Sequence, residues 1–153
     1  MVRKIVIILL VGVLTNDLVV EYRTPPTKKL IRLLEQENIM FPEVVIAQIM
    51  LETHYLQSVI YRENNNLFGM KRNSRGYCRG VRRNHCYYDT VMDSFLDYAE
   101  WQKKYTVVYT QRTGRKLRTD EDYLAYLQWI GYAEDKQYIS KLKRLIWRIQ
   151  LSR

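Results

Sequence analysis

The chain has 153 residues, enough for one ordinary domain with a real core and too few for a second domain of similar size. Apolar residues make up 47% of the sequence, a share that excludes a wholly disordered protein. Lys and Arg (25) exceed Asp and Glu (16) by 9, which favours attraction to a polyanion such as nucleic acid, an anionic membrane or an acidic polymer. The alternative is that this surplus serves solubility alone.

The first 24 residues are expected to form a leader. Two basic residues precede an apolar run over residues 5–14, which is the pattern of a signal peptide. Ten residues are too few for a membrane-spanning helix, which needs roughly 20. No cleavage site of small residues follows, so an uncleaved anchor and a buried strand stay open as alternatives. Two prolines then make a rigid joint, and we expect the domain over residues 25–153.

The most informative stretch runs from Val44 to Lys71. Its first half is apolar on nearly every side, which predicts a helix buried in the centre of the domain, with Pro42 in its first turn. Glu52 is the acid in this helix, and apolar residues lie at helical spacings from it. Burial would raise the pKa of its carboxyl, as a general acid requires. The alternative, from the residues alone, is a structural glutamate bonded to the main chain.

The segment after this helix is predicted to form a polar turn and then a small basic β-hairpin. Three asparagines at 64–66 indicate the turn, because asparagine tolerates left-handed backbone. Residues 71–83 contain six basic residues and no acid, and the alternation from residue 77 to 87 is typical of paired strands. Cys78 and Cys86 flank the turn of this hairpin, so they could form a disulfide; two free thiols are the alternative.

Four further helices surround the central one in this prediction. The first ends near Asn38. Capping boxes at Thr90 and Thr119 begin two more, ending near Tyr105 and at Gly131, and the last runs from Lys136. The sequence thus predicts a mostly α domain of α+β character, with about five helices and one hairpin.

Several kinds of site are set aside. Cys78, His85 and Cys86 lack a fourth ligand at zinc spacing, so no metal site is expected. Neither cysteine has an evident orienting partner for nucleophilic catalysis, and no phosphate-binding glycine loop is present. We therefore expect no cofactor.

Several motifs, in order, resemble those of the bacterial glucosaminidases of flagellar-rod and autolysin type, glycoside hydrolase family seventy-three. The central helix reads Ala-Gln-x-x-x-Glu-Thr over 47–53, and residues 65–71 read Asn-Asn-Leu-Phe-Gly-Met-Lys. Residues 88–99 resemble the aromatic-x-Ser segment of the family and the helix after it. Residues 131–135 with Tyr138 are similar to its Gly-Tyr-Ala-Thr-Asp joint. The resemblance covers the chain from Thr27 to about Ile149.

This resemblance implies a lysozyme-like fold, with the central helix supplying a catalytic acid between an α lobe and a small β lobe. It assigns Glu52 as the general acid and Tyr132 as the tyrosine that faces it. The substrate would be peptidoglycan, cut at the β-1,4 bond on the reducing side of N-acetylglucosamine. Substrate-binding roles are expected for the turn and for two residues near the hairpin: Asn65, Asn66, Gly69, Tyr88 and Arg79. Phe68 is expected in the core.

The chain departs from the family in the hairpin, because residues 72–85 contain no carboxylate. Many members place a second acid there. Glu63 and Asp89 are the nearest candidates in sequence for that second carboxylate. Attack assisted by the N-acetyl group of the substrate would require no second carboxylate from the enzyme.

The expected protein is thus an exported, monomeric peptidoglycan hydrolase of the glucosaminidase type. It would bind glycan strands rather than nucleic acid, and its first residues would allow transient membrane contact. Two alternatives remain: a muramidase or lytic transglycosylase on the same polymer, and a basic module that binds wall polymer or nucleic acid without cutting it.

Overall fold

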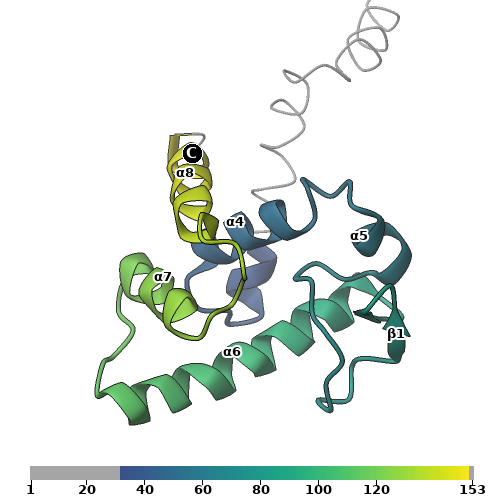
Figure 1. The fold of residues 1–153 in the computed structure, drawn as a ribbon, viewed down its shortest axis with the longest axis horizontal. Coiled ribbons are helices and arrows are strands. Elements are labelled where there is room, and N and C mark those ends of the chain that lie inside the picture. Colours follow the sequence, from purple (N-terminus) through teal and green to yellow (C-terminus); the bar gives the residue numbers. More distant parts are fainter. Residues whose placement is uncertain (1–31, 152–153) are drawn as a thin grey trace, which may run out of the picture.

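The computed structural model describes residues 32–151 (Figure 1). The expected leader over residues 1–24 lies outside the described residues. Within 32–151 the protein is mostly helical with one two-stranded antiparallel sheet, so the prediction of a mostly α domain with a small hairpin is confirmed. No helix in this part of the chain combines the length and apolar character needed to cross a membrane.

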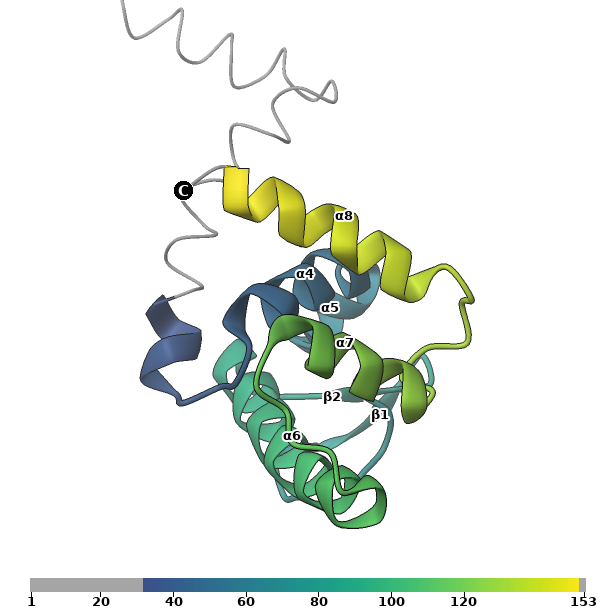
Figure 2. The same ribbon diagram turned by 90° about the vertical axis from the view of Figure 1, so that its left-hand side faces the viewer.

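Helix α4 (Pro42–Glu52) is the centre of the domain. Its residues 44–49 are all buried, as the near-continuous apolar run predicts. It packs against α8 (Tyr138–Leu151) and α7 (Asp120–Trp129), and both views place it between α8 and α6 (Figures 1 and 2). A short helical segment, residues 32–36, precedes it.

Helix α4 ends at Glu52 because the next residues leave helical geometry. The Thr53 hydroxyl donates to the Ile49 carbonyl at 2.6 Å and accepts from the Leu56 amide at 2.8 Å. Residues 54–56 all have positive φ, between 48° and 65°. Leu56, which lies at a helical spacing from Glu52 in the sequence and was expected on its face, therefore does not lie on the face of α4 that carries Glu52. Helix α5 (Val59–Asn64) follows, with Ser58 as its N-cap.

The β lobe is smaller than the alternation predicts. Strand β1 (Gly80–Arg82) pairs with β2 (His85–Tyr87) through a two-residue turn at Arg83 and Asn84, whose φ angles are 51° and 60°. Such left-handed pairs form the tight hairpin turns that match strand twist. Cys78 and Cys86 are joined by a disulfide across the lobe.

Helix α6 (Val91–Thr113) is longer than predicted, because it continues eight residues beyond Tyr105 and ends where Gly114 adopts a φ of 70°. The hydroxyls of Thr106 and Thr113 donate back to carbonyls one turn earlier, which accommodates threonine inside the helix. Capping boxes start α6 at Thr90 and α7 at Thr119, as predicted. Helix α8 begins two residues after the predicted Lys136.

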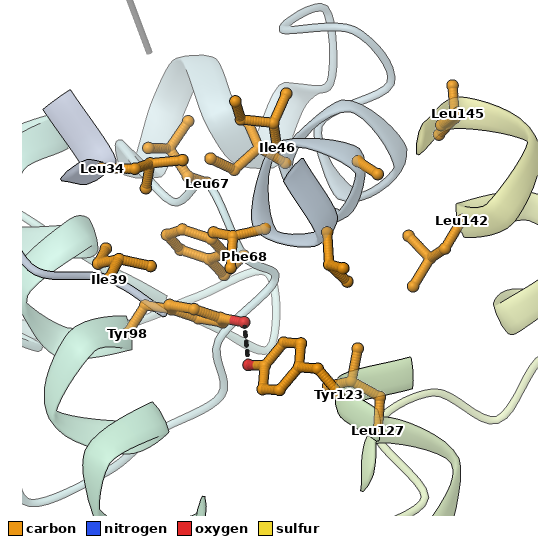
Figure 3. Packing of buried hydrophobic residues seen from close by; sticks show 14 of the residues in the cluster. Leu34, Ile39, Ile46, Leu67, Phe68, Tyr98, Tyr123, Leu127, Leu142 and Leu145 are labelled. Carbon is orange, nitrogen blue, oxygen red and sulfur yellow. Dashed lines mark hydrogen bonds between the residues drawn. The ribbon is translucent and has the colours of Figure 1, made fainter. Parts of the chain in front are cut away.

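One apolar core joins these elements (Figure 3). Phe68, expected in the core, is buried there and stacks on the ring of Tyr98 with centroids 3.9 Å apart. Ile46 of α4 and Leu142 of α8 belong to the same cluster. Phe68 therefore fixes the segment after the asparagine turn against α6. The next residue, Gly69, faces the groove described below.

Candidate active site

A groove of about 970 Å³ opens at the carboxyl end of α4. Three parts of the chain form its walls: the last residues of α4, the segment 68–75, and the connection 130–138 that leads into α8. Trp101 of α6 also lines it. Polar and apolar residues both line this groove, and it is open rather than enclosed, so it can admit part of a long ligand.

Glu52 lies in this groove as the last residue of α4, where it is partly buried. Burial raises the pKa of its carboxyl above the ordinary 4.5. A hydrogen bond from the Tyr138 hydroxyl and the positive charge of Lys71 oppose that rise. The carboxyl thus holds its proton to higher pH than an exposed glutamate would, which is the direction that a general acid requires.

Gly69 also lines the groove, and its backbone lies against Glu52. Its φ is +63°, and a Cβ at this position would sit 2.9 Å from Oε2 of Glu52. Only glycine allows both this conformation and this approach. Of the residues expected to bind substrate, Gly69 is the one that the structure brings to Glu52.

Tyr132 lines the groove as well, but its hydroxyl donates to the Phe68 carbonyl at 3.1 Å. Its ring stacks on Tyr138 with centroids 5.6 Å apart and meets the edge of Trp101 at 5.3 Å. The hydroxyl that pairs with Glu52 belongs to Tyr138 instead. Sequence reasoning placed Tyr138 in the joint motif without giving it a role.

The two asparagines that are predicted to contact substrate form hydrogen bonds to the backbone around the turn. The Asn66 side chain is 1% exposed; it donates to the carbonyls of Met70 and Cys86 and accepts from the amides of Phe68 and Met70. Asn65 has a φ of 52° and donates to the carbonyls of residues 88 and 89. Neither lines the groove. Their role is to shape the turn that presents Gly69.

Tyr88 and Arg79 also lie away from the groove lining. Tyr88 is 3% exposed, and its hydroxyl donates to Asp97 at 2.6 Å. The exposed Arg79 pairs with Asp89 at 2.7 Å. Tyr88 is therefore buried, and the structure does not bring Arg79 to Glu52; a substrate-binding role for either residue stays a prediction.

The two candidates for a second carboxylate form surface ion pairs outside the groove lining. Glu63 pairs with Arg83 at 3.0 Å, and Asp89 with Arg79. Among the described residues, the carboxylates that line the groove with Glu52 are Glu134 and Asp135, which sequence reasoning did not single out.

Asp135 is already engaged at the start of α8. It accepts from the amide of Gln137 at 2.8 Å and from Lys141 at 2.6 Å, and these bonds lower its pKa. Glu134 is exposed at the groove wall. The position of both acids next to Tyr132 in sequence was the only available signal for them.

Basic side chains give one wall of the groove its charge. Lys71, Arg72 and Arg75 follow Gly69, and Lys104 contributes from α6. Arg75 is held by the buried carboxylate of Asp97, which also accepts from Asn73 at 2.8 Å. This wall would attract carboxylates of a ligand. Residues 32–151 contain no group of three or more His, Cys, Asp or Glu side chains that could hold a metal.

Comparison with known proteins follows the same part of the chain. Residues 28–151 match the sequence model of the family described as mannosyl-glycoprotein endo-beta-N-acetylglucosaminidase. The exo-glucosaminidase LytG of Bacillus subtilis is 26% identical over 141 residues, covering 78% of this chain and 48% of that protein. The chain thus spans about half the length of this curated relative.

Among solved structures, the catalytic domain of the autolysin Auto from Listeria monocytogenes matches with a TM-score of 0.60. The match covers 90% of this chain and 88% of that one, at 24% identity. The predicted lysozyme-like arrangement, a central helix between an α lobe and a small β lobe, is confirmed by this likeness of fold.

Proposed function

The chain belongs to the glucosaminidase family of glycoside hydrolases, and from this premise we propose that it cuts peptidoglycan with Glu52 as general acid. The bond cut is the β-1,4 link on the reducing side of N-acetylglucosamine. The observation that carries the proposal is the Glu52 carboxyl in an open groove, with a pKa raised by burial. The enzyme acts outside the cytoplasm, where this polymer lies, and as a monomer.

Glu52 delivers its proton to the glycosidic oxygen as the bond to the anomeric carbon breaks. Tyr138 donates a hydrogen bond to the same carboxyl, which fixes its orientation and stabilises the carboxylate left behind. Tyr132 and Trp101 supply aromatic surface beside it, against which a sugar ring can pack. Lys71, Arg72 and the groove's other cations meet the carboxylates of the stem peptides.

Departure of the leaving group needs a second participant at the anomeric carbon. In our proposal the N-acetyl carbonyl oxygen of the substrate bonds to that carbon as the bond to the protonated leaving oxygen breaks, and Glu52, now a carboxylate, takes the proton of the water that opens the resulting ring. The predicted carboxylates Glu63 and Asp89 are engaged in surface ion pairs. Glu134 is the competing candidate, since it lines the groove wall. Activity of Glu134→Gln within about threefold of wild type supports substrate assistance; a loss of about a hundredfold or more assigns the base to Glu134.

The test of the function is a zymogram and a turbidity assay on purified peptidoglycan, followed by mass spectrometry of the fragments. Wild type is expected to clear the polymer and to release fragments ending in reducing N-acetylglucosamine. Glu52→Gln is expected to be inert, whereas Glu63→Gln, altered only at the surface, should retain activity. Full activity of Glu52→Gln contradicts the proposal.

The same fragments separate the alternatives. Reducing N-acetylmuramic acid identifies a muramidase, and anhydromuramic acid a lytic transglycosylase. An inert wild type that binds the polymer or DNA with a steep salt dependence identifies a binding module.

A further inference from the structure

A run of buried hydrogen bonds crosses the core toward the groove, and its far end is fixed by backbone. The Gln102 side chain is 2% exposed; its Oε1 accepts from the Met40 amide and its Nε2 donates to the Met40 carbonyl, both at 2.9 Å. These two hydrogen bonds to the Met40 backbone allow the Gln102 amide only one orientation. Nε2 also donates to the Tyr123 hydroxyl at 3.0 Å.

That orientation fixes the direction of the next bonds. Since Tyr123 accepts from Gln102, its own proton is free for the Tyr98 hydroxyl 2.8 Å away (Figure 3). Tyr98 then donates to Oε1 of Gln48 at 2.6 Å. The Gln48 amide must consequently present Nε2, a donor, at its other end. Reversing any of these bonds would leave a buried polar atom without its partner.

Nε2 of Gln48 faces the Tyr138 hydroxyl at 3.4 Å. A tyrosine hydroxyl has one proton, so a Tyr138 that accepts from Gln48 gives its proton to Glu52, with which it hydrogen-bonds. Every bond from Gln102 onward thus points the same way, toward the Glu52 carboxyl. We refer to the residues that carry it as the buried relay: Gln102, Tyr123, Tyr98, Gln48 and Tyr138.

We propose that Gln48 is a positioning residue of the active site, and that the buried relay obliges Tyr138 to donate to the catalytic carboxyl rather than to accept its proton. This inference rests on the proposed function of Glu52. With Tyr138 acting as a donor, the proton of Glu52 is not drawn into the core and stays available to the glycosidic oxygen. Gln48 itself is wholly buried and touches no ligand.

The groups that can alter this arrangement are few. Tyr138 and Tyr132 face Glu52 from the wall leading into α8, and Lys71 faces it from the segment after Gly69. Arg72 and His85 line the same groove, as do Glu134 and Asp135 of the connection that leads into α8. Burial raises the pKa of Tyr138 well above 10, so its hydroxyl remains a donor wherever the enzyme would work.

The test uses Tyr98→Phe, which removes the hydroxyl that fixes Gln48 but retains the ring stacked on Phe68. Without it the Gln48 amide can turn over, accept from Tyr138 and take that proton away from Glu52. The titration of Glu52, followed by carbon NMR of labelled glutamate, is expected to move to higher pH. Tyr138→Phe, which deletes the donor itself, is expected to move it further in the same direction.

Tyr126→Phe is the matched control. Tyr126 is equally buried in the same aromatic core, but its hydroxyl has no hydrogen-bond partner among residues 32–151, so its removal should leave the Glu52 titration unchanged. A merely structural role for the buried relay would lower the melting temperature of Tyr98→Phe without moving the titration. That result, with a folded near-UV circular dichroism spectrum, overturns the inference.

The readout also separates this inference from the proposed function. In an active enzyme, the alkaline limb of kcat/KM should follow the NMR titration of each variant, with a loss on the order of tenfold at most in the variants of the buried relay. If wild type does not cut peptidoglycan but Tyr98→Phe still moves the Glu52 titration, the proposed function fails and the positioning role stands. If wild type cuts peptidoglycan and the Glu52 titration is the same in wild type and Tyr98→Phe, the proposed function stands and the positioning role fails.

Discussion

Gly69 and Glu52 are in direct contact, with room for a hydrogen but not for a methyl group between them. A Cβ on residue 69 would lie 2.9 Å from Oε2 of Glu52. The turn that presents Gly69 is held by the Asn66 side chain on both sides, at the Phe68 and Met70 amides. The position of the carboxyl is thus determined by the shape of a neighbouring backbone segment.

Gly69→Ala should therefore displace the carboxyl and lower activity by about tenfold or more, because a small misplacement of a catalytic group is costly. It should also destabilise the protein by about 1 kcal/mol or more through its positive φ. Gly114→Ala is the matched control: its φ is +70° and its Cβ would meet nothing within 4 Å. Turbidity kinetics and thermal unfolding on both variants check this. Equal activity per folded molecule contradicts a steric role.

Lys71→Met should move the alkaline limb of the activity profile to higher pH. The Lys71 charge lowers the pKa of Glu52, so its removal lets the carboxyl hold its proton longer, and a general acid is active while protonated. Lys143→Met, which breaks a surface pair with Glu121, should leave the limb in place. A limb that moves to lower pH in Lys71→Met would contradict Glu52 as the acid.

The raised pKa of Glu52 also predicts a stability difference. As the pH rises above the ordinary 4.5, the unfolded chain loses the Glu52 proton before the folded protein does. The contribution of Glu52 to the free energy of unfolding is therefore full below pH 4.5 and declines as the pH rises through the raised pKa of the folded protein. Glu52→Gln removes that decline. Its gain in melting temperature over wild type should be larger at about pH 8 than at about pH 4. A gain in melting temperature that is the same at both pH values would contradict a raised pKa for Glu52.

Asp97→Asn should destabilise the domain by about 3 kcal/mol or more, because it leaves the largely buried Arg75 without its carboxylate. The same carboxylate receives Tyr88 and Asn73, so the basic wall of the groove should loosen as well. Asp89→Asn breaks only the exposed pair with Arg79 and should cost less than about 1 kcal/mol. Denaturant unfolding compares the two; similar losses would be contrary to this account.

Reduction of the disulfide should lower the melting temperature by about 10 °C. The bond closes a loop of 8 residues in sequence separation, worth roughly 2 to 3 kcal/mol in the chain-entropy account, and 1 kcal/mol corresponds to about 4 °C at this size. Cys78→Ser should approach the reduced wild type. Cys86→Ser should be less stable still, because Cys86 is wholly buried in the core.

Patterns within single segments were the most predictable part of this fold. The apolar run predicted α4, and Pro42 predicted where it begins. The Thr-x-x-Asp capping boxes predicted where α6 and α7 begin. The end of α6 could not be read in the same way, because Thr106 and Thr113 have unfavourable propensities that their own back-bonds accommodate. The early end of α4 depends on three left-handed residues, none of them glycine, and no local signal announced it.

The sequence predicted that Glu52 and Gly69 lie close together, but not which side chains contact them. Glu52 and Gly69 lie in recognisable motifs. The roles of Asn66, Tyr88 and Arg79 depend on which way each side chain turns, and that is decided by carbonyls and carboxylates far along the chain, such as Cys86 and Asp97. Tyr138 and Tyr132 are both tyrosines of one motif, and only packing determines which hydroxyl meets the acid.

The packing of α8 on α4 has a consequence for biosynthesis. Gln48 and Tyr138 meet across 90 residues of sequence, and α8 is the last described element. A chain still emerging from the ribosome or crossing a membrane carries its glutamate long before it carries the tyrosine that orients it. A protein cut short before residue 138 would lack that hydroxyl altogether. An incomplete chain of this kind would also lack part of the groove wall beside Glu52.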